Sequence, residues 1–410
     1  MLAVITKIKP SEWERKKVHK IVNTFLENTR PKLRGLKIVL GGSFAKDTWL
    51  SGDHDIDLFV KFPYNLYRKK NLSELLAKRL SNYNLVHGSR DYFQVQYKGY
   101  LFELIPVLDI KTQSKAVNIT DVSPLHALWV QDNINHLADD IRLVKAFAKA
   151  NNIYGAESYI QGFSGYLLEV LTIYYKGFFN LVKAASSWKE PEFIDIHAHY
   201  KNKTHAFRDL NKSKLSSLVV IDPVQKSRNA AAALSSEKFH RFVETCRKFI
   251  HFPSEKFFEQ KQVDIKTLKD RAAANTLLYI ELKPLEGKKD VIGCKIMKAF
   301  SLLKERMHSS GFEFIDTGWE FSKEKSKLWF ILQDSILPEK RKHYGPRIDD
   351  EKNKLHFIQK WHSHEIHEEQ GRIHVFVKRE HRKADDFAKH FLRSPHVKDC
   401  FKKIIKVKIY

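Results

Sequence analysis

Three carboxylates in the N-terminal part of the chain have the spacing needed for metal-dependent phosphate chemistry. Asp55 and Asp57 are two residues apart in a segment that alternates polar with aliphatic residues, so on a strand both side chains lie on one face. Glu103 interrupts the apolar run from Tyr100 to Val107, and a buried carboxylate has to be paired, protonated or bound to metal. Carboxylates that share a small space repel one another unless divalent cations lie between them. The pattern predicts a metal-binding cradle; a surface strand end and a salt-bridged core glutamate are the alternatives.

A glycine-containing turn upstream of these carboxylates could bind the phosphates of a nucleotide. Gly41-Gly42-Ser43 follows the apolar run 36–40 and precedes a segment with helical character. Backbone amides, a helix N-terminus and the Ser43 hydroxyl could therefore face a triphosphate, with Lys46 one turn later adding charge. A Gly-Ser pair alone is a weak signal. Followed by Asp-x-Asp on a strand, it has the order of the nucleotidyltransferase head that also occurs in polymerase beta.

The elements that must position these residues follow from the apolar periodicity. In the N-terminal part we expect a helix over 10–26, strands over 36–40 and 55–62, and a hairpin of 92–97 with 100–107. From 141 to about 252 the pattern is mainly helical. The elements expected beyond it are strands at 276–282, 328–332 and 404–410, and helices at 295–308 and 350–362.

These patterns predict three domains. Residues 1–138 would form the catalytic head with a mixed sheet, and 139–255 a helical central domain. Residues 256–410 would form a basic, mixed α/β C-terminal body and tail. The expected fold class is therefore α+β and multidomain, with a polymerase-beta-like nucleotidyltransferase head.

The composition favours a polyanionic partner. The chain carries 72 Lys and Arg against 48 Asp and Glu, a formal net charge of +24, so nucleic acid is the first candidate and a solvated basic surface the alternative. Its three cysteines indicate neither a disulfide framework nor a thiolate zinc site. The N-terminus does not resemble a secretory signal, and the most apolar segment, 163–182, carries charges. We therefore expect that segment to be a buried or amphipathic helix, with no membrane partner and a cytoplasmic location.

Longer motifs make a family resemblance specific. The segment from Gly42 to Gly52, leading into Asp55-Ile56-Asp57, is similar to the archaeal, or class I, CCA-adding enzymes. Further segments similar to that family are 153–157, 162–167, 220–224 and 227–231, with weaker ones at 344–346 and 371–372. The resemblance implies a tRNA nucleotidyltransferase that adds or repairs C, C and A at the tRNA 3′ end. It would use CTP and ATP, two Mg²⁺ ions and no nucleic-acid template, and release pyrophosphate.

The resemblance also implies a role for each matching residue. The residues that would hold the two Mg²⁺ ions, and so act in catalysis, are Asp55, Asp57 and Glu103. Those that would contact the nucleotide are Ser43, Lys46, Ser123, His126, Lys145, Tyr154 and Arg228. Among these, Arg228 would read the base edge together with the RNA backbone. The positions that depart from the family's usual residues are Glu103 (usually aspartate), Lys46 (commonly arginine) and Ser123 (threonine).

Several features allow more than one interpretation. Arg228 could be a structural arginine paired with Asp222. The basic, aromatic C-terminal segment is expected to bind the tRNA acceptor arm and 3′ end, and a polar helix end or loop explains the histidines of 362–369 more simply than a metal site. Alternatives for the whole chain are a poly(A)-type terminal RNA nucleotidyltransferase and an RNA-binding protein on an inactive nucleotidyltransferase fold. A homodimer is compatible with every motif.

Overall fold

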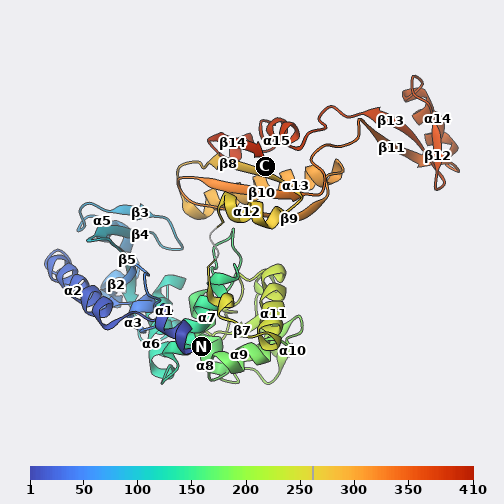
Figure 1. Cartoon of the computed structure of the whole chain (residues 1–410). Coiled ribbons are helices and arrows are strands. Elements are labelled where there is room, and N and C mark those ends of the chain that lie inside the picture. Colours follow the sequence, from blue (N-terminus) through green and yellow to red (C-terminus); the bar gives the residue numbers. More distant parts are fainter. Residues whose placement is uncertain (261–262) are drawn as a thin grey trace. The chain divides into compact units, whose positions relative to one another are not determined.

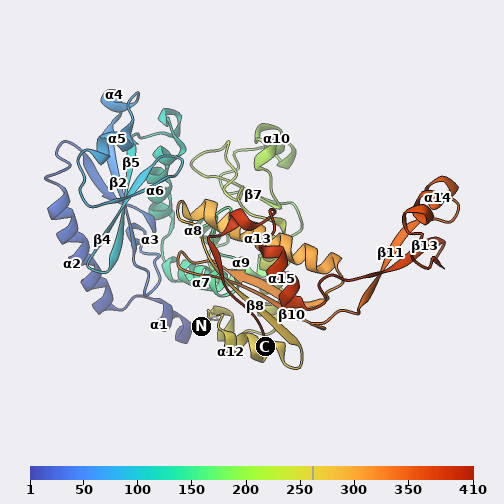
Figure 2. The ribbon, with the colours of Figure 1, turned by 90° about the horizontal axis from the view of Figure 1, so that it is seen from above.

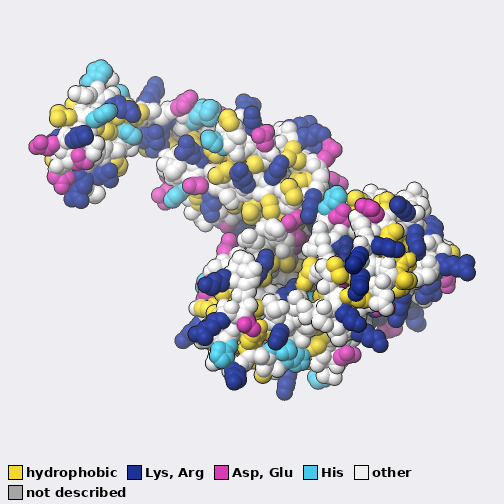
Figure 3. Space-filling view, turned by 180° about the vertical axis from the view of Figure 1, so that it is seen from behind, with side chains coloured by type: hydrophobic (Ala, Val, Ile, Leu, Met, Phe, Trp, Pro, Cys, Tyr) yellow, Lys and Arg dark blue, Asp and Glu magenta, His cyan; other side chains and the backbone are white. Residues whose placement is uncertain are grey.

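The computed structural model describes residues 1–260 and 263–410, which belong to two compact units, Met1–Lys261 and Gln262–Tyr410 (Figure 1). Lys and Arg side chains are spread across the face shown in Figure 3. Within the described residues, no helix is long and apolar enough to cross a membrane. The division into three domains with boundaries near 138 and 255 stays a prediction.

The N-terminal unit contains a five-stranded mixed sheet. Strands β2 and β5 are parallel neighbours, and the other neighbouring pairs are antiparallel. In spatial order the strands are β1 (Lys37–Leu40), β2 (Asp55–Pro63), β5 (Tyr100–Asp109), β4 (Tyr92–Tyr97) and β3 (Asn84–Val86). The expected mixed sheet is confirmed, as is the β4–β5 hairpin.

Helix α2 (Glu12–Thr29) packs its apolar side chains against one face of this sheet. Ser11 caps the helix, because its hydroxyl accepts a hydrogen bond from the Glu14 backbone N–H at 3.1 Å. Phe25 of α2 stacks on Phe102 of β5 with 3.9 Å between the ring centroids. The polar side chains of β2 and β5 must therefore lie on the opposite face. The other helices up to residue 133 are α1 (Leu2–Ile8), α3 (Gly42–Ala45), α4 (Tyr64–Tyr67), α5 (Leu72–Ala77), η1 (Gln113–Lys115), η2 (Ile119–Val122) and α6 (Ser123–Asn133).

The rest of the N-terminal unit is mainly helical around an aromatic core. Phe147, Phe178 and Phe249 meet edge to face in it, with ring centroids 5.5 to 5.8 Å apart. The helices are α7 (Ala138–Ala150), α8 (Gly165–Tyr174), α9 (Phe178–Ala185), α10 (Lys203–Asp209), η3 (Lys212–Lys214), α11 (Ser236–His251) and η4 (Glu255–Phe258). The apolar segment 163–182 thus forms two helices, broken at Gly177, whose φ is +128°.

A short parallel sheet in this helical part was not expected from the sequence. It pairs β6 (Glu192–Asp195) with β7 (Leu218–Ile221). Every residue of β7 is buried, so its apolar run lacks the alternation that distinguishes a strand from a buried helix turn. The helical description of 139–255 is therefore incomplete.

The C-terminal unit contains a four-stranded antiparallel sheet, ordered β14 (Lys403–Ile409), β8 (Thr276–Lys283), β10 (Ser326–Leu332) and β9 (Phe314–Glu320). Helices α13 (Lys289–Ser309) and α15 (Ala384–Leu392) pack on one face, and α12 (Ile265–Ala272) packs on the other.

A second, three-stranded sheet of this unit lies apart from the first one (Figure 2). Its order is β11 (Lys340–Arg347), β13 (Arg372–Lys378) and β12 (His367–Glu369), and α14 (Glu351–Lys360) packs against β11. The short helix η5 (Lys398–Cys400) precedes β14. The expected strands and helices of the C-terminal part are confirmed, with ends shifted by up to six residues.

Candidate functional site

The three predicted carboxylates lie on the polar face of the five-stranded sheet. In the parallel pairing of β2 with β5, Asp57 is directly opposite Glu103. The alternating residues Ile56 and Leu58 point into the apolar core, so Asp55 and Asp57 share the other face. Asp55 is exposed, whereas Asp57 and Glu103 are half-buried.

The surroundings of Asp57 perturb its pKa. Burial raises the pKa of Asp57, and the nearby charge of Lys46 offsets only part of the rise; the Asp57 side chain also hydrogen-bonds to Glu103. Glu103 Oε1 accepts a hydrogen bond from Gln94 Nε2 at 2.7 Å. Burial, together with the charges of Glu103 and Asp57, raises the pKa of Tyr92 to about 12. Sequence reasoning missed Gln94 and Tyr92, which the polar–apolar alternation along β4 could have indicated.

The donor set fits divalent metal ions. Carboxylate oxygens are the hard ligands that Mg²⁺ prefers, and Asp55, Asp57 and Glu103 supply them from one face of two adjacent strands. Among the described residues, no three His, Cys, Asp or Glu side chains already converge as a metal site. Because neighbouring strands are only about 4.8 Å apart, rotations about side-chain bonds are enough to bring the carboxylates together.

Gly42 allows the loop after β1 to approach the carboxylates closely. Its φ is +57°, and a Cβ atom at this position would lie 1.6 Å from Asp57 Oδ2. Ser43 follows within α3, but α3 ends after four residues, so the helical character expected from the sequence over 43–50 is wrong beyond Ala45. A helix this short has little macrodipole. Phosphate binding here would depend on backbone amides, the Ser43 hydroxyl and Lys46.

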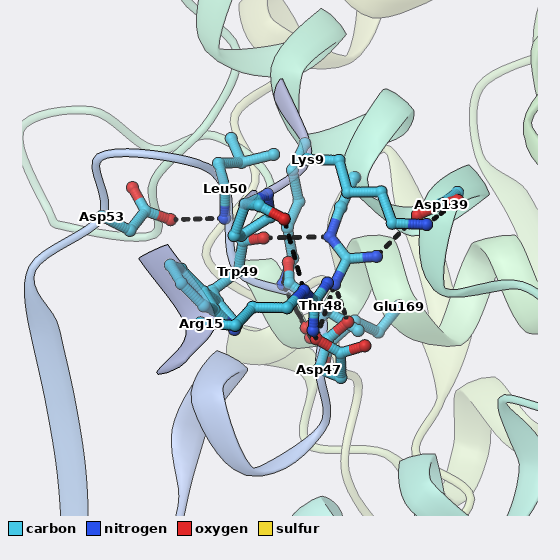
Figure 4. Close-up of polar contacts among 12 residues, drawn as sticks. Lys9, Arg15, Asp47, Thr48, Trp49, Leu50, Asp53, Asp139 and Glu169 are labelled. Atoms are coloured by element: carbon cyan, nitrogen blue, oxygen red, sulfur yellow. Dashed lines mark hydrogen bonds and ion pairs between the residues drawn. The ribbon is translucent and has the colours of Figure 1, made fainter. Parts of the chain in front are cut away.

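Lys46 and Lys145 meet at one buried carboxylate, that of Glu169, which is labelled in Figure 4. Lys46 Nζ lies 2.5 Å from Glu169 Oε2, and Lys145 Nζ lies 2.8 Å from Glu169 Oε1. The Thr48 hydroxyl also donates to Glu169 Oε1, at 2.8 Å. Burial alone would raise the pKa of Glu169, but the charges of Lys145 and Lys46 lower it to about 2. The structure thus brings two predicted nucleotide-binding lysines together through a glutamate that sequence reasoning did not single out.

A second buried group fixes the loop that carries Lys46 (Figure 4). Arg142 of α7, which is only 1% exposed, donates to the carbonyl oxygen of Trp49 at 3.0 Å and to Asp47 Oδ1 at 2.7 Å. Its Nη1 also donates to Asp139 Oδ1 at 2.6 Å. Because one rigid guanidinium binds the loop at several points, the segment after α3 is held against α7.

Asp222 gathers Arg228, predicted to read the base edge, and His126, predicted to contact the nucleotide, with Tyr166, which sequence reasoning did not single out. It forms an ion pair with Arg228, lies 3.1 Å from His126 Nε2, and accepts a hydrogen bond from the Tyr166 hydroxyl at 3.2 Å. Burial alone would raise the pKa of Asp222, but His126 and then Arg228 lower it to about 2. The pairing of Arg228 with Asp222 is therefore present. Arg228 still keeps 32% of its side chain exposed, so it can also present donors to a ligand.

Helix α8 joins these two clusters. Tyr166 and Glu169 are three residues apart on it, so they lie on one face, about one turn from each other. Tyr154 belongs to the same region, since a Cβ atom at Gly165 would lie 2.9 Å from its hydroxyl. Within residues 1–260, the side chains of Ser43 and Ser123 form no hydrogen bond to either cluster.

Comparison with known proteins places this arrangement in a family. The nucleotidyltransferase domain model matches residues 18–121, the second-domain model of tRNA nucleotidyltransferases matches 139–259, and the C-terminal domain model of CCA-adding enzymes matches 275–407. The CCA-adding enzyme of Nanoarchaeum equitans is 36% identical over 345 residues, which is 83% of each chain. The chain belongs to the family of CCA-adding enzymes. The expected CCA tRNA nucleotidyltransferase is thereby confirmed at the level of the family.

Other CCA-adding enzymes match over similar lengths. The CCA-adding enzyme of Methanosarcina mazei is 32% identical, and the match covers 85% of this chain and 78% of that enzyme. The CCA-adding enzyme of Pyrococcus abyssi is also 32% identical, and the match covers 78% of this chain and 75% of that enzyme. Among solved structures, one of the RNA terminal uridylyl transferase Cid1 superposes with a TM-score of 0.50 and 15% identity. It covers 64% of this chain and 97% of Cid1, and it shows a shared fold.

Proposed function

We propose that this chain adds C, C and A to the 3′ end of tRNA from CTP and ATP, with release of pyrophosphate. The observation that carries the proposal is the single face of α8 that joins a lysine cluster to an arginine cluster. Positive charge beside three carboxylates suits a triphosphate. An arginine fixed by Asp222, whose partner Tyr166 lies about one turn along α8 from Glu169, suits a base edge. The family of CCA-adding enzymes supplies the choice of tRNA, CTP and ATP.

The phosphate end of the nucleotide would lie at the loop after β1. Lys46 supplies a point charge for the phosphates, and Ser43 and the backbone amides beside Gly42 supply hydrogen-bond donors. Arg142 holds this loop on α7, so the donors keep their places before the nucleotide arrives. Such preorganisation lowers the cost of positioning charge for phosphoryl transfer.

The base end would lie at Asp222. A guanidinium whose Nη1 is held by a buried carboxylate presents its remaining N–H groups in fixed directions. Arg228 would use them to read the base edge, and His126 and Tyr166, whose rings are 4.5 Å apart, would border the base. Selection of C or A would then come from the protein and the RNA end, without a nucleic-acid template.

Asp55, Asp57 and Glu103 would hold two Mg²⁺ ions. When bound, such ions lower the pKa of an attacking hydroxyl and neutralise charge on the leaving phosphates. The protein's own contribution is to place three carboxylates on one polar sheet face, opposite the apolar face that α2 covers. Glu103 reaches this face from β5, where its extra methylene gives the ligand more freedom than aspartate would have.

The C-terminal unit would bind the tRNA acceptor arm. The whole chain has a formal net charge of +24, and a basic surface suits phosphate contacts, which fix position without reading sequence. Exposed Tyr344 and Phe376 on the three-stranded sheet add apolar surface beside basic residues such as Lys342 and Lys378. This role predicts RNA binding that weakens steeply with salt.

The test is extension of a tRNA that lacks its last three nucleotides, in Mg²⁺ with CTP, ATP or both, with products sized at single-nucleotide resolution. Two additions with CTP, and a third only when ATP is also present, are expected. An unbounded ladder with ATP alone would instead identify a poly(A)-type enzyme. Absence of extension and of pyrophosphate release with every RNA would identify an inactive RNA-binding protein.

A further inference from the structure

Glu169 is a buried carboxylate that three side chains from two other segments share. The carboxylate has no solvent exposure, and the side chains of Lys46 and Lys145 are only 9% and 4% exposed. Its partners are Lys46 and Thr48 from the loop after α3 and Lys145 from α7. Two ammonium groups on one carboxylate leave a local charge of +1, so the cluster is not neutral in itself.

The two lysines differ in how many of their donors are used. An ammonium group has three N–H donors. Lys145 directs all three to partners within 3.2 Å: the Thr48 carbonyl, the Thr48 hydroxyl and Glu169 Oε1. For Lys46 Nζ the structure records Glu169 Oε2, and the charge of Lys46 also acts on Asp57. Within the part of the chain that the structure describes, Lys46 Nζ makes no other hydrogen bond, so its remaining N–H groups can bind a ligand between α8 and the carboxylates of the sheet.

We propose that Glu169 is a positioning residue that holds the Lys46 ammonium ready for the triphosphate and then shares it with, or releases it to, the phosphates. The inference rests on the proposed function. Lys145 makes the exchange possible, because a buried carboxylate cannot be left without a cation and Lys145 stays bound to it. Without Glu169, Lys46 would turn toward Asp57, on whose carboxylate its charge already acts, and would be drawn away from the phosphates.

Glu169→Gln tests this, with dissociation constants of CTP and of CMP measured on the full chain in Mg²⁺ without tRNA. Glutamine keeps the size of the side chain and removes the charge that holds Lys46. We expect CTP binding to weaken about tenfold, as loss of one well-placed charge contact would produce, with CMP binding unchanged. In a Lys46→Met background, Glu169→Gln should have no further effect on CTP binding, because the residue through which it acts is gone.

Controls separate positioning from general damage. Glu281→Gln removes a glutamate that is also buried and lysine-paired, but in the C-terminal unit, and it should leave CTP binding unchanged. If Glu169→Gln does not fold, Glu169→Asp keeps the charge, shortens its reach to Lys46 and should show the same selective loss for CTP.

Three results would each overturn the inference while leaving the proposed function intact. They are an equal weakening of CTP and CMP binding, an unchanged dissociation constant for CTP, and additive effects of Glu169→Gln and Lys46→Met on CTP binding. A wild-type chain that neither binds CTP nor extends tRNA would overturn both.

Discussion

Replacing Gly42 with alanine should disable the carboxylate site without unfolding the protein. The added Cβ would lie 1.6 Å from Asp57 Oδ2, far closer than any real contact, so the carboxylate or the loop has to move. The required movement exceeds about 1 Å, and misplacement of a catalytic group by that distance costs about 10²-fold in rate. In transition-state free energy this is about 2.7 kcal/mol.

The backbone cost of the same substitution can be measured separately. Gly42 has a φ of +57°, where a side chain costs about 1–2 kcal/mol. Gly35 has a φ of +83°, and no atom lies within 4 Å of the point that an added Cβ would occupy, so Gly35→Ala carries a similar backbone cost without the clash. Gly35→Ala should therefore melt a few degrees below the wild type, and Gly42→Ala at least as far below it, because relief of the clash adds strain.

The assay is kcat/KM for the first CMP incorporation into a tRNA lacking its last three nucleotides, with melting temperatures by circular dichroism. Gly42→Ala should fall about 10²-fold below Gly35→Ala, which should stay near the wild type. If the two alanine variants had equal activity, close approach of the loop to Asp57 would not matter for catalysis and the geometric argument would be refuted.

Three further predictions concern specificity, acid stability and metal dependence. Asp222→Asn should lower the preference for the correct nucleotide, because Arg228 loses the ion pair that fixes it. An unchanged ratio of CMP to AMP incorporated at each position would contradict this. Burial raises the pKa of Asp222, but His126 and Arg228 lower it by more, from 3.8 to about 2. The ionised Asp222 therefore contributes about 2 kcal/mol to stability above about pH 4, and this contribution is lost as the pH falls toward 2. Urea unfolding from pH 5 downward should accordingly show that the difference in free energy of unfolding between the wild type and Asp222→Asn shrinks in acid. A difference that stays constant with pH would count against the pairing. Removal of divalent metal with EDTA should abolish nucleotide addition, and Mg²⁺ should restore it. The helical circular dichroism should not change, because apolar cores hold the fold. Loss of the helix signal on chelation would show a structural metal instead.

Much of the N-terminal fold could be predicted from local patterns. The Ser11 cap, the apolar stripe of α2 and the alternation along β2 are encoded by residues close together in sequence, and each formed as expected. The strand β7 was missed because four apolar residues carry no period that separates strand from helix, and β6 because four residues are too few to show an alternation. The early end of α3 was also missed, since loop residues there are held by distant Arg142 rather than by local propensity.

The sequence alone predicted the chemistry of the candidate site, because Asp-x-Asp after a glycine turn places carboxylates and phosphate donors by local geometry. It also indicated Arg228, although it could not decide whether Asp222 would pair with it. Only the tertiary structure revealed Glu169 as the carboxylate on which the two predicted lysines converge, and it showed that Asp222, a possible partner in sequence, does pair with Arg228. Lys46 lies 123 residues from Glu169 along the chain, and a buried ion pair at such a separation depends on how distant elements pack, which no local sequence pattern specifies.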